Sequence, residues 1–207
     1  MIIGLTGKYC AGKNSIAVLL ENRGFSVLDV DTLGHIAIEN KKTAIISRFG
    51  NDIKNHDGSV NRRILGEKVF RKDCELAALQ EIVHPEANRL TLEWMQEQKA
   101  KHCVINASLL HNSVVFDRMD CIILVDAPLI TRLIRAKKRD KLPWMTIFKR
   151  FSSQKHFFSH YFNGNADIYK VENRGLGEPA NLTRLESTIN DILSRLDIKN
   201  HKNEGGF

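Results

Sequence analysis

The sequence predicts a three-layer α/β/α fold built around a five-stranded parallel sheet. Short apolar runs of strand length alternate along the chain with segments of helical spacing, and the first run leads through a glycine-rich loop into a helix at 13–23. Parallel strands that helices cover on both faces appear in a sequence as continuous apolar runs of this kind. The expected strands are 1–6, 25–30, 103–107, 121–125 and 166–171.

Helical spacing recurs between and after these runs. The further helices that we expect are 43–49, 61–70, 74–83, 86–100, 128–138, 143–155 and 181–196. The region 43–100 separates two strands yet carries at least three helical segments, too many for one connection, so we expect a helical insertion over the substrate side. We expect the helical pair at about 128–160 to form a lid.

Length and composition fit one domain. With 207 residues and 43% hydrophobic content, the chain can bury the core of a single α/β domain, expected at 1–198, with a disordered tail at 199–207. No apolar run reaches about eighteen residues and no basic leader is present, which favours a cytoplasmic protein without a membrane partner. The four cysteines have no metal-binding spacing, so no structural metal is expected.

The charge balance indicates an anionic partner. The net charge is +7 and the sequence pI is about 9.3, which suits nucleic acid, a membrane surface or a phosphorylated metabolite. The basic residues are spread along the chain, and neither a zinc finger nor an aromatic-basic RNA-binding motif is present. These observations favour a phosphorylated small molecule over nucleic acid.

Residues 7–13 (GKYCAGK) fit the phosphate-binding pattern GxxxxGK. The segment follows an apolar strand and precedes a helix, where loop N–H groups and the positive end of the helix can bind phosphate oxygens while Lys13 reaches the outer phosphates. An ordinary glycine-rich turn with a solvated lysine is the alternative, and the flanking strand and helix argue against it. The nucleotide contacts that we expect here are Gly7, Cys10, Ala11, Gly12, Lys13, Asn14 and Ser15.

Asn14 departs from this pattern, which has Ser or Thr after the lysine as a ligand of Mg²⁺. Ser15 does not replace that hydroxyl, because one helical step turns a side chain by about 100°. The carboxamide oxygen of Asn14 is an acceptable hard ligand. We therefore expect Asn14 to bind Mg²⁺, and to bind it more weakly than a hydroxyl would.

Two groups of charged residues are candidates for the chemistry. Asp29 and Asp31 follow the second strand, where α/β sheets place their ligands, and a carboxylate there could accept the proton of an attacking hydroxyl. Asp31 could equally be a helix N-cap. Arg132, Arg135 and Arg139 are spaced so that the last two share a helical face that could bind phosphates, although a solvated basic face has the same spacing.

Taken in order, these segments resemble the dephospho-CoA kinase family, whose members use ATP to phosphorylate the ribose 3′-hydroxyl of dephospho-coenzyme A. The likeness runs from Met1 to about Leu196. The start of the phosphate loop and the segment 27–31 (VLDVD) are similar to the family's loop and to its IDAD segment. The resemblance implies that Asp31 is the catalytic base and that Lys13 and Arg139 stabilise charge.

Other segments extend the resemblance to the acceptor side. Residues 58–70 (GSVNRRILGEKVF) are similar to the family's G-x-L-D-R-x-x-L…V-F stretch, which implies an acceptor contact at Arg62. His84-Pro85 matches its HP pair and implies a further contact at His84, although a His before Pro is also typical of a helix boundary. Residues 108–112 (SLLHN) stand where the family has PLLFE, which implies a contact at Leu109.

The lid and the last strand complete the resemblance. Arg135 and Arg139, followed by Arg150 and Gln154, are similar to the family's R-x-x-x-R…R-x-x-x-Q pattern. The segment 166–175, with Asn173, resembles the family's A-D…N-x-G segment near the adenine of ATP. The resemblance therefore implies ATP contacts at Arg135, Arg139 and Asn173.

The activity implied is ATP-dependent phosphorylation of dephospho-coenzyme A, the last step of coenzyme A synthesis, with ATP and Mg²⁺ as cofactors. A kinase for another nucleotide-like acceptor is an alternative. Lys8-Tyr9, Asn14 and Asn112 depart from the family pattern, and the two asparagines keep open a catalytically weak P-loop protein that binds ATP or coenzyme A. We expect a monomer or weak homo-oligomer in the cytoplasm, with no nucleic-acid or membrane partner.

Overall fold

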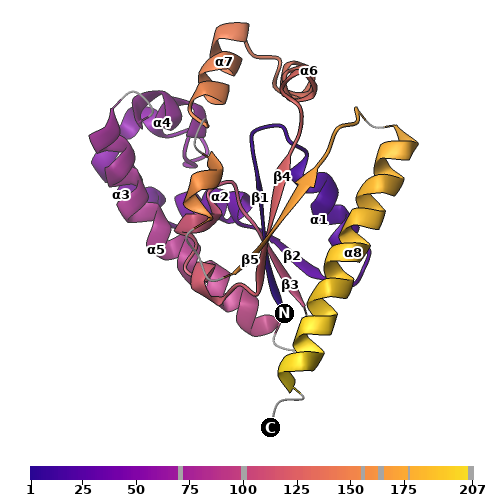
Figure 1. The fold of residues 1–207 in the computed structure, drawn as a ribbon. Helices are drawn as coiled ribbons and strands as arrows, with labels where there is room; N and C mark the ends of the chain where they lie inside the picture. The colour runs from indigo at the N-terminus through magenta and orange to yellow at the C-terminus, as the bar shows by residue number, and fades with distance from the viewer. Residues whose placement is uncertain (70–71, 99–101, 155–156, 163–165, 177, 205–207) are drawn as a thin grey trace. The chain divides into compact units, whose positions relative to one another are not determined.

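The computed structural model describes residues 1–69, 72–98, 102–154, 157–162, 166–176 and 178–204. Five strands form one sheet in the order β2-β3-β1-β4-β5 (Figure 1). Strand β1 pairs in parallel with β3 and with β4, and β4 pairs in parallel with β5. The strands are β1 (Ile2–Gly7), β2 (Ser26–Asp29), β3 (Cys103–Asn106), β4 (Cys121–Asp126) and β5 (Asp167–Glu172). The predicted five-stranded α/β fold is confirmed.

Helices α1 (Lys13–Glu21) and α8 (Pro179–Glu204) cover one face of the strands. Ile16 and Leu20 of α1 and Ile189 of α8 pack against Ile3 and Ile123 of the central strands, and none of these five side chains has measurable exposure. Burial of apolar area at about 25 cal/mol per Å² stabilises this layer. Helix α8, the yellow helix in Figure 1, lies against α1 and β5.

The opposite face of β1 lies against two short 3-10 segments. A Cβ added at Gly4 would lie 2.5 Å from Met119 Sδ and 2.7 Å from Leu110 Cδ2, so this position has no room for a side chain. Both residues belong to the segment between β3 and β4, which contains η2 (Leu110–Asn112) and η3 (Phe116–Arg118). The central strands β1, β3 and β4 are therefore buried on both faces, as the continuous apolar runs predicted, whereas β2 and β5 are mostly half-buried.

The chain divides into two compact units, residues 1–27 with 100–207, and residues 28–99. We describe each by itself. The second unit is helical and has its own core, in which Ile45, Ile53 and Leu65 are fully or almost fully buried. Its elements are α2 (Val30–Asn40), α3 (Lys42–Phe49), η1 (Asn51–Ile53), α4 (Arg62–Val69) and α5 (Asp73–Glu97). This unit begins at residue 28, before the predicted insertion at 43–100. The last two residues of that insertion, 99 and 100, lie outside the described residues.

Two sequence-based helix boundaries are wrong in this unit. The expectation of separate helices at 74–83 and 86–100 is corrected by α5, a 25-residue helix that continues through Pro85. Proline removes one helical hydrogen bond, but α5 packs against α2, and the buried Glu86 accepts a hydrogen bond from Asn40 Nδ2 at 2.8 Å. Helix α2 was not predicted, and Ala37 is its single buried residue.

The remaining helices of the first unit follow the prediction more closely. Helices α6 (Leu129–Asp140) and α7 (Trp144–Ser152) lie in the expected lid, of which residues 155 and 156 are outside the described part of the chain. Helix α8 extends to Glu204, well into the segment 199–207 that was expected to be disordered, because 199–204 contain neither Gly nor Pro to end it. Residues 205–207 lie outside the described residues. Within the described part, no helix is long and apolar enough to cross a bilayer.

Substitutions of two apolar residues of α1, one buried and one exposed, test which face of this helix stabilises the fold. Leu20 has no exposure, whereas Val18 is 51% exposed. Leu20→Ala should lower the free energy of unfolding by about 2–5 kcal/mol, because it leaves a cavity in the core. Val18→Ala should change it by no more than about 0.5 kcal/mol. Urea unfolding of both variants measures the difference, and equal losses would contradict the described packing.

Candidate active site

The phosphate loop lies between β1 and α1, and two of its glycines cannot be replaced without moving neighbouring groups. Gly12 has φ 92, and a Cβ there would lie 2.2 Å from Asn173 Nδ2. A Cβ at Gly7 would lie 2.6 Å from the Val125 carbonyl oxygen. Cys10 also has positive φ, at 58, which is uncommon for a residue with a side chain. The loop is thus packed closely against β4 and the end of β5.

Arg135 joins the phosphate loop to the segment after β5. Its Nη1 donates to the carbonyl oxygens of Ala11 at 2.8 Å and Cys10 at 3.3 Å. Its Nη2 donates to Asn173 Oδ1 at 2.9 Å and to the Gly175 carbonyl oxygen. Burial lowers the pKa of this guanidinium, and the carbonyl and amide acceptors satisfy its N–H groups. In this arrangement Arg135 orients the loop, while the predicted phosphate contact from Arg135 stays a prediction.

A cavity of about 690 Å³ opens beside the loop, in the same unit. Its walls combine loop residues, charged residues of α6, and apolar residues of α8 and of the segment before it. The lining residues are Cys10, Gly12, Ser15, Arg135, Lys138, Arg139, Asn173, Leu176, Glu178, Asn181, Leu182 and Leu185. The structure therefore brings six of the predicted ATP contacts to one hollow. Sequence reasoning missed the apolar wall at Leu176, Leu182 and Leu185, because apolar residues in a helical pattern equally indicate core.

Arg139 and Arg132 have different surroundings on α6. The Arg139 side chain is 62% exposed, and its Nε donates to Asp140 Oδ1 at 2.7 Å. That ion pair raises the pKa of Arg139, so it stays charged. Arg132 is buried, and its Nε donates to the Tyr9 carbonyl oxygen at 2.9 Å while its guanidinium lies 4.5 Å from the centre of the Phe151 ring. Arg139 thus remains accessible to a ligand, and Arg132 supports the loop.

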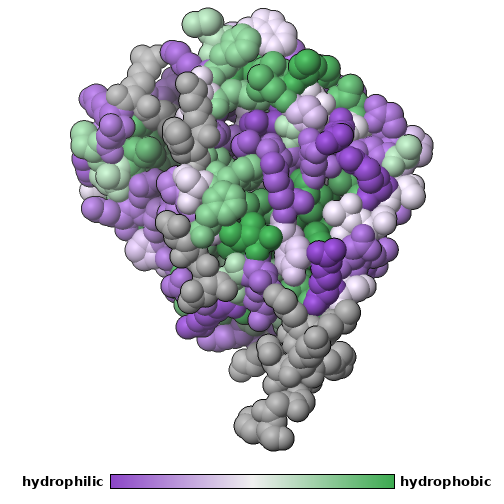
Figure 2. All heavy atoms as spheres, in the orientation of Figure 1, coloured by the Kyte–Doolittle hydropathy of each residue, from purple (hydrophilic) through white to green (hydrophobic). Residues whose placement is uncertain are grey.

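The exposed apolar side chains of α6 and α7 gather on the upper part of the molecule in Figure 2. They are Leu129, Ile130, Ile134, Trp144, Met145 and Phe148. Trp144 and Phe148 stack with ring centres 6.1 Å apart, and Lys137 Nζ lies 5.2 Å from the Trp144 ring. Contiguous apolar surface of this kind is typical of a segment that contacts a ligand or partner. The lid function of this segment stays a prediction.

Asn106 was not among the predicted site residues. It ends β3, pairs in register with Leu5, and lies on the sheet face that α1 covers. The residue is 2% exposed, and its Oδ1 accepts no hydrogen bond from any described residue. Lys13, Asn14 and Ser15 form the first turn of that same helix. A polar residue at the end of the apolar run 103–106 was the sequence signal that could have identified it.

In the second unit, Asp29 rather than Asp31 caps helix α2. The Asp29 carboxylate accepts hydrogen bonds from the backbone N–H groups of Asp31 at 3.0 Å and Thr32 at 3.4 Å. The alternative role of Asp31 as N-cap is therefore wrong. Asp31 lies in the first turn of α2, two residues after the cap.

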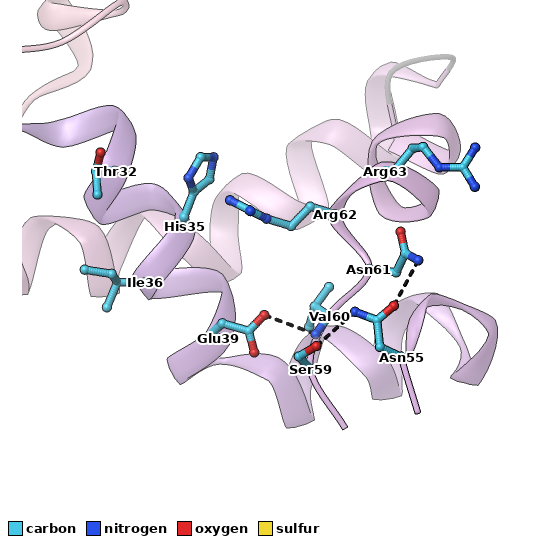
Figure 3. Close-up of a pocket in the computed structure, with 10 residues that line it drawn as sticks. All are labelled: Thr32, His35, Ile36, Glu39, Asn55, Ser59, Val60, Asn61, Arg62 and Arg63. Carbon is cyan, nitrogen blue, oxygen red and sulfur yellow. Dashed lines mark hydrogen bonds between the residues drawn. The ribbon is translucent and has the colours of Figure 1, made fainter. Parts of the chain in front are cut away.

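A cavity of about 660 Å³ lies between α2 and the segment that leads into α4 (Figure 3). Its lining residues are Thr32, His35, Ile36, Glu39, Asn55, Ser59, Val60, Asn61, Arg62 and Arg63. The Arg62 side chain extends toward His35, whereas Arg63 points away and pairs with Glu67 at 3.5 Å (Figure 3). Asn61 Oδ1 accepts a hydrogen bond from Ile64 N at 3.1 Å, which caps α4 and fixes the start of this wall.

His84 and Leu109 line neither cavity. His84 is an exposed residue inside α5, so its alternative as a helix boundary is wrong. Leu109 is 51% exposed in the turn after β3. Their acceptor contacts stay predictions. In the same turn His111 stacks on His160 with ring centres 4.6 Å apart, and burial lowers the pKa of His111.

A phosphate loop between β1 and α1 of a parallel sheet, with a cavity against it, defines this fold as that of a P-loop kinase. The sequence model of the dephospho-CoA kinase family matches residues 1–159. A dephospho-CoA kinase of Treponema denticola is 33% identical over 84% of this chain and 82% of its own length. One of Halalkalibacterium halodurans is 34% identical over 96% and 98%. The chain belongs to the dephospho-CoA kinase family.

Solved structures agree with this fold. A crystal structure of the Thermus thermophilus protein TT1252 has a TM-score of 0.77, with 29% identity over 95% of this chain and 97% of that one. The dephospho-CoA kinase from Campylobacter jejuni has a TM-score of 0.66 and 21% identity over 94% and 97%. A shikimate kinase from Bacteroides thetaiotaomicron, at 0.53 and 13% identity over 94% and 98%, shares the fold alone.

Arg135→Lys tests whether the planar guanidinium organises the nucleotide site. A lysine cannot donate at once to the loop carbonyls and to Asn173, so the loop should lose its fixed shape. The dissociation constant for ATP, measured by calorimetry, should rise about tenfold, as expected for lost hydrogen bonds to a charged group. Arg195→Lys, an exposed position on α8, is the matched control. Equal affinity in both variants would contradict this role of Arg135.

Proposed function

We propose that this chain transfers the γ-phosphoryl group of ATP to the ribose 3′-hydroxyl of dephospho-coenzyme A, giving coenzyme A and ADP. The observation that carries the proposal is the glycine-constrained phosphate loop with its adjoining cavity, in a chain that belongs to the dephospho-CoA kinase family. The family assignment does not favour a different acceptor or a protein that only binds its ligands. We further propose that it acts in the cytoplasm, as a monomer or weak homo-oligomer.

In this proposal the protein positions the reactants and stabilises charge, as phosphoryl transfer requires. Lys13 and Arg139 neutralise the charge that develops on the transferred group and on ADP. The Asp31 carboxylate accepts the proton of the attacking 3′-hydroxyl, whose oxygen forms the new bond to phosphorus as the bond to ADP breaks. Asp31 stands just after the end of β2, where open α/β sheets place their ligands, and this position supports the role.

The acceptor is proposed to bind in the second unit, where the cavity of about 660 Å³ includes Arg62. Dephospho-coenzyme A carries a diphosphate, and a guanidinium binds phosphate oxygens in a bidentate manner. Figure 3 shows the Arg62 side chain directed along the cavity wall toward His35. Its neighbour Arg63 already pairs with Glu67, so Arg62 is the better candidate.

Mg²⁺ fits the residues near the start of α1. Asn14 offers an amide oxygen as a ligand, and Asn106 offers a buried amide oxygen without a described donor, which suits a magnesium-bound water. The described residues include no cluster of three or more His, Cys, Asp or Glu that could hold a metal. The ion, when bound, neutralises charge on the phosphates.

The activity and the proposed base can be tested together. Purified protein with ATP and Mg²⁺ should phosphorylate dephospho-coenzyme A and leave AMP and adenosine unmodified. Asp31→Asn should lower kcat by about 10²–10⁴-fold, the range for loss of a general base. Asp191→Asn, an exposed position on α8, should leave kcat unchanged. Undiminished turnover by Asp31→Asn would exclude Asp31 as the base.

The weakened magnesium site can be tested at Asn14. Asn14→Thr introduces the hydroxyl that a P-loop places here, and the Mg²⁺ concentration that gives half-maximal activity should fall several-fold. Asn14→Ala removes the amide oxygen and should raise that concentration. A magnesium titration in which both variants match the parent would show that Asn14 does not contact the ion.

A further inference from the structure

Tyr9 is bound to the α6–α7 segment by both of its backbone groups. Its N–H donates to Gln154 Oε1 at 2.7 Å, and its carbonyl oxygen accepts from Arg132 Nε at 2.9 Å. Arg132 Nη2 also donates to Gln154 Oε1, at 3.3 Å, which closes a small network around the backbone of one residue. The backbone of the phosphate loop is therefore fixed to α6 and α7 at Tyr9.

The Tyr9 side chain extends this connection to three charged residues. Its hydroxyl donates a short hydrogen bond to Asp140 Oδ2 and accepts one from Arg150 Nη1 at 3.3 Å. The guanidinium carbons of Arg139 and Arg150 lie 5.3 Å and 5.4 Å from the centre of its ring, within the range of cation–π attraction. Phe151 packs edge-on against the same ring, with centres 5.6 Å apart.

Asp140 holds both arginines in this cluster. Its Oδ1 accepts from Arg139 Nε at 2.7 Å, and its Oδ2 accepts from Arg139 Nη2 and Arg150 Nη1 at 3.3 Å and 3.2 Å. The hydrogen bond from Arg139 holds the pKa of Asp140 below its usual range, so the carboxylate is ionised at neutral pH. A guanidinium has five N–H donors. Arg139 uses two of them here and lines the cavity beside the loop.

We propose that Tyr9 is a positioning residue that, through Asp140, aims Arg139 at the outer phosphates of ATP. The inference rests on the proposed function for the identity of the reaction, but not for the nucleotide contact itself. The phosphate loop supplies the tyrosine and the lid supplies the carboxylate, so the loop that binds the phosphates also orients the arginine that neutralises them. A residue without an aromatic hydroxyl at position 9 could not provide this contact.

The hydroxyl contributes because Asp140 would otherwise be held by the arginines alone. Two long side chains on the surface retain rotamer freedom even when paired. A tyrosine side chain has only two rotatable torsions, and the ring of Tyr9 is fixed by Phe151 and two cations. It therefore restricts the position of Asp140, and with it the direction in which Arg139 presents its remaining donors.

The test is Tyr9→Phe, which keeps the ring and removes the hydroxyl. Tyr169→Phe removes a hydroxyl from β5 in the same way and is the matched control. Binding of ATP and of AMP to both variants is measured by calorimetry, together with kcat for dephospho-coenzyme A and the Tm. Tyr9→Phe should weaken ATP binding and lower kcat, each about five- to tenfold, and should leave AMP binding and the KM for dephospho-coenzyme A unchanged.

A double-mutant cycle identifies the residue through which Tyr9 acts. If Tyr9 works through Arg139, Tyr9→Phe added to Arg139→Ala should weaken ATP binding no further than Arg139→Ala does alone. Additive losses, equal losses for ATP and AMP, or a Tyr9→Phe variant that behaves like Tyr169→Phe would each overturn the proposal. Should Tyr9→Phe lower the Tm by more than about 4 °C, Asp140→Asn takes its place, with the same expected loss of ATP binding.

The outcomes for Tyr9 and for the proposed reaction are separable. A parent protein that binds ATP but does not phosphorylate dephospho-coenzyme A would overturn the proposed function, while the comparison of ATP with AMP would still decide the role of Tyr9. A parent protein that turns over normally, with ATP affinity and kcat unchanged in Tyr9→Phe, would overturn the role of Tyr9 and leave the function standing.

Discussion

A phosphate loop must turn its N–H groups inward, and its carbonyl oxygens then face the protein and need donors of their own. Arg135 provides them. One guanidinium binds two loop carbonyls on one side and Asn173 with Gly175 on the other. A planar, permanently charged group can satisfy acceptors on both sides at once, which a lysine cannot do. The loop, the end of β5 and the start of α8 are therefore organised around one side chain of α6, and the cavity beside the loop exists because these segments are held together.

In the second unit, the N-cap of α2 separates the roles of two neighbouring aspartates. The cap is Asp29, the last residue of β2, whose carboxylate takes the free N–H groups at the start of α2. Asp31 follows two residues later, in the first turn of α2, and is not the N-cap. One of the two aspartates near the end of β2 therefore caps a helix, and the other is the proposed proton acceptor. The sequence alone does not say which residue has which role, because an aspartate suits both.

Much of the fold could be predicted because buried parallel strands leave continuous apolar runs, and all five expected strands are present. The phosphate loop was recognisable because its GxxxxGK spacing lies within one short stretch of the chain, between an apolar run and a helical segment. The continuity of helix α5 through Pro85 could not be predicted, because it depends on packing against α2 and on the buried Glu86. Asn106 escaped notice for a related reason. Its significance lies in an unsatisfied oxygen beside α1, and that requires knowing which strand lies next to β1.

The cavity residues show the same limit. Leu176, Leu182 and Leu185 have the pattern of an ordinary helix approaching a core, and only the position of α8 against the loop exposes part of them to a hollow. Charged residues were easier to nominate than to place. Arg132 and Arg139 lie on one helix, yet the first is buried under the loop and the second is open to solvent.

The burial of Cys10 in the phosphate loop has a chemical consequence. Its thiol is almost fully buried in the bend of the loop, and burial raises its pKa, so the group is protonated rather than a thiolate at neutral pH. Thiolates are the species that react with peroxides and electrophiles. Cys74, on α5, is exposed, while Cys10 is buried and contributes to the wall of the cavity beside the loop. Because burial favours the protonated thiol, the cysteine of the phosphate loop is a weaker target for oxidants and electrophiles than a thiolate at that position would be.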